Sequence, residues 1–132
     1  MPTPPPIGPL AQMALAELAM IVPSPRAGEE IEVWIRVHAR HARRRERQIL
    51  LALAVAVGDR RAGATGPPSD GVWRPETDAE ASSATLLSER LVAAYLNDDV
   101  DTQLALAAAW GSWEPAARGE ALRVLVRLLT SR

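Results

Sequence analysis

The stretch of residues 29–57 constrains the fold most, because it joins an acidic start, an arginine cluster and an entirely apolar end in one uninterrupted helical pattern. At about 100° per residue, its apolar and basic side chains separate onto opposite sides. The glutamates of its first turn lie at the positive end of the helix dipole. After Gln48 the residues are apolar on every side, which is typical of a helix buried in a bundle. The sequence therefore predicts one continuous helix over residues 29–57, ended by Gly58.

Arginines recur at regular intervals along this predicted helix. The regularly spaced residues are Arg36, Arg40, Arg43 and Arg47, and Arg44 flanks them. On a continuous helix they form a straight basic stripe about 16 Å long, enough to follow a few consecutive phosphates of a nucleic acid strand. Arg45 interrupts the apolar side of the same helix. Either the helix leaves the core there, or Arg45 reaches solvent along its aliphatic stem.

Prolines mark both ends of the first predicted helix. Residues 1–8 are rich in proline and predict an extended N-terminal arm. Pro9 suits the first position of a helix, and Pro23 stops that helix. The helix between them is apolar nearly all round, so we expect it to be buried in its own bundle or against another molecule.

The second half of the chain predicts a loop followed by three shorter helices. Residues 58–76 are rich in Gly and Pro and predict one long loop. Thr77 and Glu80 have the spacing of a capping box, which predicts that the next helix opens there. Further helix boundaries are indicated by Asp98 or Asp99 as a cap, by Gly111 as a stop and by Pro115 just inside the last helix.

No stretch alternates apolar and polar residues as a strand does. The fold class is therefore expected to be all-α: a compact bundle of about five helices, with residues 9–132 as a single domain. The chain has no cysteine, which excludes disulfides and thiolate metal sites and favours a reducing, cytoplasmic location. Neither a signal peptide nor an apolar run of membrane-spanning length is visible, so we expect no membrane partner.

Catalytic and metal-binding motifs are missing. His38 and His41 lie on neighbouring turns of the predicted helix, but a zinc site needs at least a third ligand. The acidic cluster lacks the glycine and glutamate of a calcium loop and suits helix capping instead; its members are Asp98, Asp99 and Asp101. Neither a phosphate-binding loop nor a serine nucleophile motif occurs. We therefore expect no enzyme, no metal and no cofactor.

The arginine cluster is the candidate site. The formal net charge is −1, yet residues 36–47 carry six arginines against Glu46 alone. The cluster could meet nucleic acid phosphates or an acidic protein partner. Alternatively, it could form a solvated face, or a face paired with acids of the following helices such as Glu89, Asp98 and Asp99. Exposed ion pairs contribute only about 0–1 kcal/mol, so pairing within the chain explains such a concentration weakly. With phosphate, in contrast, each arginine contributes to the binding affinity through bidentate contacts and counterion release.

The residues assigned to nucleic acid backbone contact are Arg36, Arg40, Arg43, Arg44 and Arg47. The candidate secondary contacts are His41, Arg60, Arg61, Arg123 and Arg127. Three tryptophans could also contact a ligand. Trp73 in the loop is either an anchor for a partner or a lid over the core, and Trp110 and Trp113 either stack bases or wedge into the core. Large aromatic residues are mostly buried, which favours the lid and the wedges.

A small, all-helical, cysteine-free chain whose basic residues gather at Arg36, Arg40, Arg43, Arg44 and Arg47 resembles the small subunits of CRISPR effector complexes. The resemblance is one of architecture over most of the chain. It implies a non-catalytic subunit, repeated within a ribonucleoprotein of antiviral defence, that holds RNA or single-stranded DNA by its backbone beside other subunits or copies of itself. Phosphate contacts of this kind carry no sequence specificity. The alternative is a protein-only adaptor, chaperone or oligomeric scaffold that docks through the N-terminal apolar helix.

Overall fold

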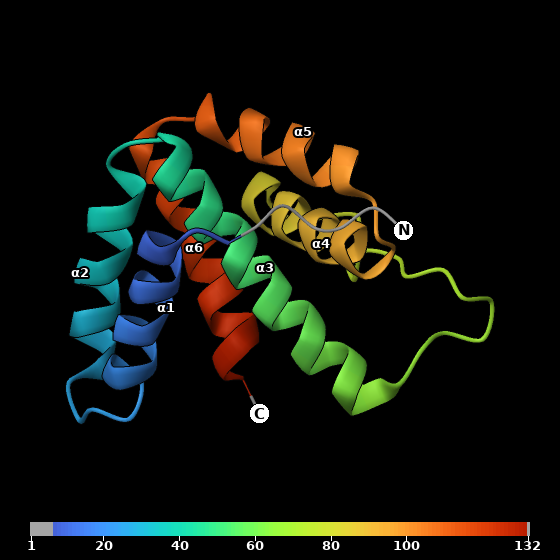
Figure 1. Cartoon of the computed structure of the whole chain (residues 1–132), viewed down its shortest axis with the longest axis horizontal. Helices are drawn as coiled ribbons and strands as arrows, with labels where there is room; N and C mark the ends of the chain where they lie inside the picture. Colours follow the sequence, from blue (N-terminus) through green and yellow to red (C-terminus); the bar gives the residue numbers. More distant parts are fainter. Residues whose placement is uncertain (1–6, 132) are drawn as a thin grey trace.

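The computed structural model describes residues 7–131 of the chain, and all of its regular structure there is helical (Figure 1). The six helices in these residues are α1 (Pro9–Ile21), α2 (Ala27–Ala39), α3 (Arg44–Thr65), α4 (Ser83–Leu96), α5 (Val100–Gly111) and α6 (Pro115–Thr130). The all-α prediction is therefore confirmed, with one helix more than expected. Of the predicted proline-rich arm, residues 1–6 lie outside the described residues, and Gly8 is the N-cap of α1.

One hydrophobic cluster receives side chains from all six helices. Helix α3 runs across the middle of the molecule, with the α1–α2 hairpin on one side and α4 and α5 on the other (Figure 1). Its residues 49–54 are all buried, as the sequence predicted for the part after Gln48, and Ile49, Leu50 and Leu53 are fully enclosed. This arrangement explains why the apolar end of the 29–57 stretch has no polar face.

The prediction of one continuous helix over residues 29–57 is wrong. Helix α2 ends at Ala39, residues 40–43 form a turn, and α3 begins at Arg44. The guanidinium of Arg118 donates to the last carbonyls of α2, and Glu46 accepts the backbone N–H of Arg43 at the start of α3. Helix ends leave such groups without partners inside the helix, so these contacts stabilise the break.

The break also explains why the side chain of Arg45 is exposed. Because residues 40–43 interrupt the helix, α3 does not continue the helical phase of α2. The side chain of Arg45 therefore does not lie on the apolar side and is 48% exposed. Its Nε donates to Oε2 of the buried Glu46 at 2.7 Å. Of the two alternatives drawn from the sequence, the one in which the helix leaves the core at this point is closer to the structure.

Gly58 does not end the third helix, contrary to the prediction. Helix α3 continues to Thr65, and Gly66, with φ of 70°, follows it. Gly58 instead lies where α3 meets α4: a Cβ there would come within 2.6 Å of Cδ2 of Tyr95. Its lack of a side chain therefore permits close helix packing. The loop predicted for residues 58–76 is accordingly displaced to residues 66–82.

The remaining helix boundaries are set by the residues at the helix ends. Ser82, and not Thr77, caps α4, and its side chain accepts the N–H of Thr85. The predicted capping box of Thr77 and Glu80 is therefore wrong. Asp99 caps α5, as one of the two predicted alternatives. The predicted boundaries that the structure confirms are Pro9 at the start of α1, Gly111 at the end of α5 and Pro115 at the start of α6.

Helix α1 divides its apolar residues between two surroundings. Ala11, Ala14 and Leu18 are buried in the bundle, whereas Met13 and Met20 are 60% and 80% exposed. The expectation of burial within the bundle thus holds for one side of the helix only. No helix in the described residues is both long and apolar enough to cross a membrane.

Candidate nucleic-acid interface

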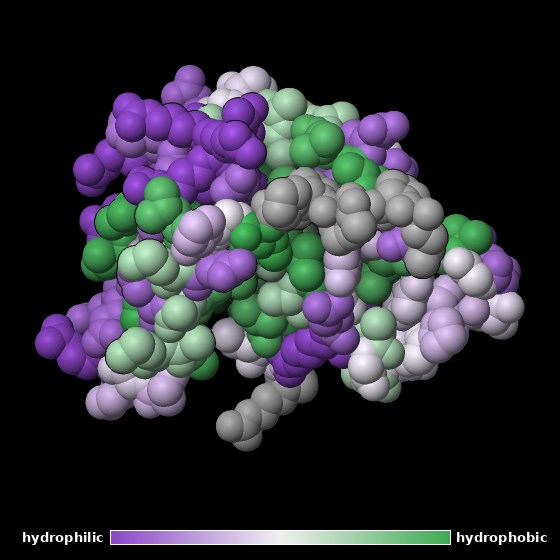
Figure 2. Space-filling view, in the orientation of Figure 1, coloured by the Kyte–Doolittle hydropathy of each residue, from purple (hydrophilic) through white to green (hydrophobic). Residues whose placement is uncertain are grey.

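The five arginines of the candidate site lie around the connection between α2 and α3. We call this surface the basic turn and define it by Arg36, Arg40, His41, Arg43, Arg44 and Arg47. Every one of these residues is exposed. Because the helix is broken, they spread over the end of α2, the turn and the start of α3, and the predicted straight stripe is wrong. Figure 2 shows the hydrophilic surface over this connection at the upper left.

The arginines of the basic turn have no acidic partner among residues 7–131: none of the five forms an ion pair there. Glu46, the acid within the run, is buried and accepts from Nε of Arg45 and from the N–H of Arg43. Burial raises the pKa of Glu46, but these hydrogen bonds outweigh it and the pKa is lowered. Glu46 is therefore a carboxylate that already accepts hydrogen bonds from Arg45 and from the backbone at the start of α3.

Arginines elsewhere are mostly engaged. Ion pairs join Arg26 to Glu29, Arg61 to Glu89, Arg74 to Asp70 and Arg123 to Glu32. Outside the basic turn, Arg90 and Arg127 are the exposed arginines of the described chain that have neither an ion pair nor a carbonyl contact. Unpaired positive charge is thus concentrated at one place on the molecule.

Arg118 supports the basic turn from inside. It is 7% exposed, its Nε donates to the carbonyl of Ala39 at 2.9 Å, and its Nη2 donates to that of Arg40 at 3.0 Å. Nη1 donates to the carbonyl of Trp113, and the guanidinium carbon lies 5.9 Å from the ring centre of Trp110. Within the described chain no carboxylate pairs with it, so its charge adds to the positive field behind the turn.

Sequence reasoning missed Arg118, although a signal was present. It lies four residues before Leu122 and seven before Leu125, on the apolar stripe of the last helix. A cation on such a stripe must either snorkel or find buried acceptors. Here it finds carbonyls at the ends of other elements.

The tryptophans of the α5–α6 corner belong to the core. Trp110 is fully buried, and its Nε1 donates to the carbonyl of Arg118 at 3.2 Å. Trp113 is partly buried against the hydrophobic cluster. The core interpretation is therefore confirmed for Trp110, which has no face open to a base.

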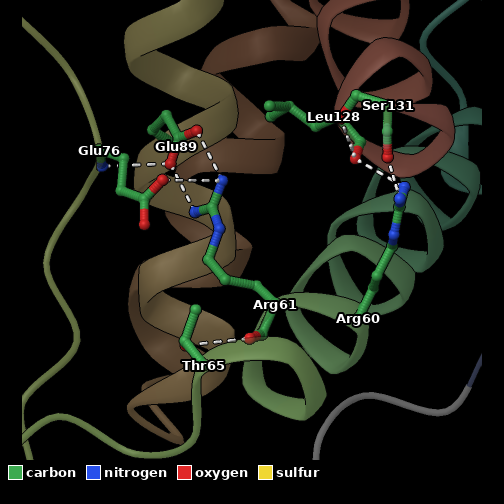
Figure 3. Close-up of polar contacts among 7 residues, drawn as sticks. All are labelled: Arg60, Arg61, Thr65, Glu76, Glu89, Leu128 and Ser131. Atoms are coloured by element: carbon green, nitrogen blue, oxygen red, sulfur yellow. Dashed lines mark hydrogen bonds and ion pairs between the residues drawn. The ribbon is translucent and has the colours of Figure 1, made fainter.

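Two of the predicted secondary contacts hold the fold together instead (Figure 3). Arg61 donates from both terminal nitrogens to Glu89, at 2.7 and 3.0 Å, and Glu89 also accepts the backbone N–H of Glu76 at 3.1 Å. The hydrogen bond to Glu89 raises the pKa of Arg61. Arg60 donates to the carbonyls of Leu128 and Leu129 near the end of α6 and to that of Ser131, which follows the helix. These contacts bind the loop to α3 and α4, and α3 to α6.

The other predicted secondary contacts differ among themselves. Arg123 pairs with Glu32 and Glu120, and its hydrogen bond lowers the pKa of Glu32. Arg127 is exposed on α6, and His41 lies within the basic turn. His41 is therefore the secondary candidate that the structure brings to the arginine cluster.

Trp73 lies beside the end of α4. Its backbone N–H and carbonyl bond to the side chain of Asn97, each at 2.8 Å. The side chain is half-buried but is not packed against the hydrophobic cluster. The lid over the core and the partner anchor therefore both stay predictions.

The two histidines do not converge. His38 is half-buried with its ring edge-on to Trp34, the ring centres 4.7 Å apart, and burial lowers its pKa. His41 is exposed in the turn. In the part of the chain that the structure describes, no three His, Asp or Glu side chains gather as metal ligands.

No protein family model, curated protein or solved structure matches this chain.

Proposed function

We propose that this chain is a non-catalytic helical accessory subunit of a larger assembly and holds a nucleic acid backbone at the basic turn. The observation that carries this proposal is the gathering of five exposed arginines without acidic partners among the described residues, while most arginines elsewhere in those residues are paired. The ligand is single-stranded nucleic acid, RNA or DNA, held through its phosphates.

The chemistry of the basic turn suits phosphate. A guanidinium binds two phosphate oxygens at once, and each contact releases counterions from the nucleic acid. Arg44 and Arg47 lie in the first turns of α3, where the positive end of the helix dipole also favours an anion. Backbone contacts position a strand without reading its bases, so we expect no sequence preference.

The helical architecture is consistent with the proposed place in a larger assembly. A bundle with one basic surface fits a subunit that lines a strand inside a ribonucleoprotein, as the resemblance to CRISPR small subunits implies. The cytoplasm is its expected location. Neighbouring subunits or further copies would then complete the path of the strand beyond the basic turn.

A matched pair of charge reversals tests the proposal. Arg44→Glu with Arg47→Glu should weaken binding to labelled single-stranded RNA at least about tenfold, because two phosphate contacts become repulsions. Glutamate is favourable near a helix N-terminus, so α3 should remain folded by circular dichroism. The control is Arg74→Glu with Arg90→Glu, which changes the net charge equally at exposed arginines outside the turn. Equal losses in both variants would refute the assignment to the basic turn.

A further inference from the structure

The corner between α5 and α6 lies beside the basic turn (Figure 1). A Cβ at Gly111, the last residue of α5, would come within 3.9 Å of Cδ of Arg47. The guanidinium of Arg118 donates both to the carbonyl of Trp113 in the corner and to that of Arg40 in the basic turn. Trp113 is therefore held next to the backbone of the basic turn.

A pocket opens at this corner, between the start of α4 and the start of α6. Its volume is about 560 Å³, which is within the usual range of ligand pockets. The lining combines an aromatic ring with hydroxyl and carboxylate groups, and it includes Ser82, Ser112, Trp113, Glu114, Ala117 and Glu120. An aromatic side chain beside a basic surface is the combination that binds the bases and the backbone of a single strand.

Trp113 is less enclosed than the tryptophans of the core. Trp34 and Trp110 are buried, and each donates its Nε1–H to a backbone carbonyl, at 3.0 and 3.2 Å. Trp113 packs against the hydrophobic cluster with only part of its side chain. Its Nε1 is not buried and has no hydrogen-bond partner among residues 7–131. The indole therefore keeps both surface and a donor for a ligand.

The charges around the corner separate the two parts of a nucleotide. Glu120 pairs with Arg123, whereas Glu114 forms no ion pair in the described part of the chain. A phosphate is repelled by the free carboxylate of Glu114, but an uncharged base is not. The backbone of a strand is thus favoured on the basic turn, and a base is favoured in the pocket.

We propose that the pocket takes one unpaired base of the strand held at the basic turn, and that the base stacks on Trp113. This inference rests on the proposed function and adds a selection of single strands over duplex. Phosphate contacts alone give no such selection, because a duplex has the higher charge density. A base in a duplex must first leave its stack to enter a pocket. Stacking accepts every base, so the absence of sequence preference is kept.

A strand without bases tests the proposal. We compare a DNA strand of about 12 thymidines with an abasic strand of the same length, which carries the same phosphates. The wild-type chain should bind the thymidine strand at least about fivefold more tightly than the abasic strand. Trp113→Leu should lose this preference, while its affinity for the abasic strand stays within about twofold and its salt dependence stays unchanged, because no phosphate contact is removed.

Three further variants separate stacking from folding. Trp113→Phe keeps an aromatic ring and should retain most of the preference for the thymidine strand. Ala117→Leu fills the pocket while Trp113 remains, so it should reduce the preference as Trp113→Leu does. Trp73→Leu, in the loop before α4, is the matched control and should bind both strands like the wild type. Circular dichroism checks that each variant is folded.

The outcomes distinguish this inference from the proposed function. Equal affinity of the wild-type chain for the two strands would overturn the pocket alone. The same holds for a preference that Trp113→Leu leaves intact, or for an equal loss of both affinities in Trp113→Leu, which would mark Trp113 as purely structural. A wild-type chain that binds neither strand at low salt would refute the proposed function, and the base pocket with it.

Discussion

The buried Arg118 donates through Nη2 to the backbone carbonyl of the exposed Arg40, at 3.0 Å, across 78 residues of sequence. A second hydrogen bond reaches the carbonyl of Ala39, so one guanidinium satisfies the two carbonyls at which α2 ends. The basic turn is therefore shaped by a contact from α6. One arginine fixes the backbone, and its neighbours on the surface remain free to bind.

Replacing Arg118 with leucine should destabilise the fold. The carbonyls of Ala39 and Arg40 lose their donor, and a buried polar group left unsatisfied costs about 1–3 kcal/mol. Urea denaturation would measure the change in the free energy of unfolding. Arg90→Leu, at an exposed position, should stay within about 0.5 kcal/mol of the wild type. Similar losses in both variants would show that Arg118 does not support the turn.

The pair of Arg61 and Glu89 should behave as a coupled buried unit. Their side chains are 14% and 3% exposed. Arg61→Met alone strands the carboxylate of Glu89 and should cost about 3–5 kcal/mol, whereas Arg61→Met with Glu89→Met should cost less than that single change. A double-mutant cycle by urea denaturation gives the coupling. Arg26→Met, which breaks an exposed pair, should cost under about 1 kcal/mol. Additive costs at Arg61 and Glu89 would contradict coupling.

Ser82 should carry the cap of α4. Its side chain accepts the N–H of Thr85 at 3.1 Å, so Ser82→Ala should lower the free energy of unfolding by about 1 kcal/mol. Thr77 is exposed and lies outside the helix, so Thr77→Ala should change it by less than about 0.5 kcal/mol. A larger loss of stability in Thr77→Ala than in Ser82→Ala would instead support the capping box that the sequence predicts.

His38 should make stability depend on pH. Burial lowers its pKa below the ordinary 6.5, Glu17 on α1 and Glu46 on α3 raise it, and Arg45 lowers it further. The unfolded chain therefore binds the proton more readily. The stability contributed by neutral His38 is complete above pH 6.5 and is lost as the pH falls from there towards the folded pKa.

His38→Phe keeps a ring beside Trp34 and removes this titration. Comparing the free energies of unfolding at about pH 7.5 and about pH 5.5 should give a smaller difference for His38→Phe than for the wild type. His41→Phe, in the exposed turn, is the matched control and should keep the wild-type difference. A wild-type pH dependence in His38→Phe would assign the effect to other groups.

The sequence predicts those features of the fold that depend on neighbouring residues. Pro9 and Pro115 mark helix starts because proline suits the first helical turn, and Asp99 is a cap because its side chain reaches a nearby N–H. The break at residues 40–43 escapes such reasoning because no Gly or Pro stands there. It depends on Arg118, which folding alone brings to the end of α2.

The same distinction applies to the candidate site. The arginine cluster is visible in the sequence, but its path over two helix ends is not. Arg61 and Arg123 look as available as Arg44 until the fold places Glu89 and Glu32 against them. Pairing between distant residues therefore decides which cations remain for a ligand, and local patterns do not report it.

The salt dependence of binding to single-stranded RNA tests the central claim most directly. Each phosphate contact contributes about 0.7 to the slope of log affinity against log salt, so five arginines correspond to a slope of about −3.5. For Arg44→Glu with Arg47→Glu we expect the slope to be shallower by about 1.4, while Arg74→Glu with Arg90→Glu should keep the wild-type slope. A wild-type chain that does not bind RNA at low salt, or a slope that Arg44→Glu with Arg47→Glu leaves unchanged, would contradict the account.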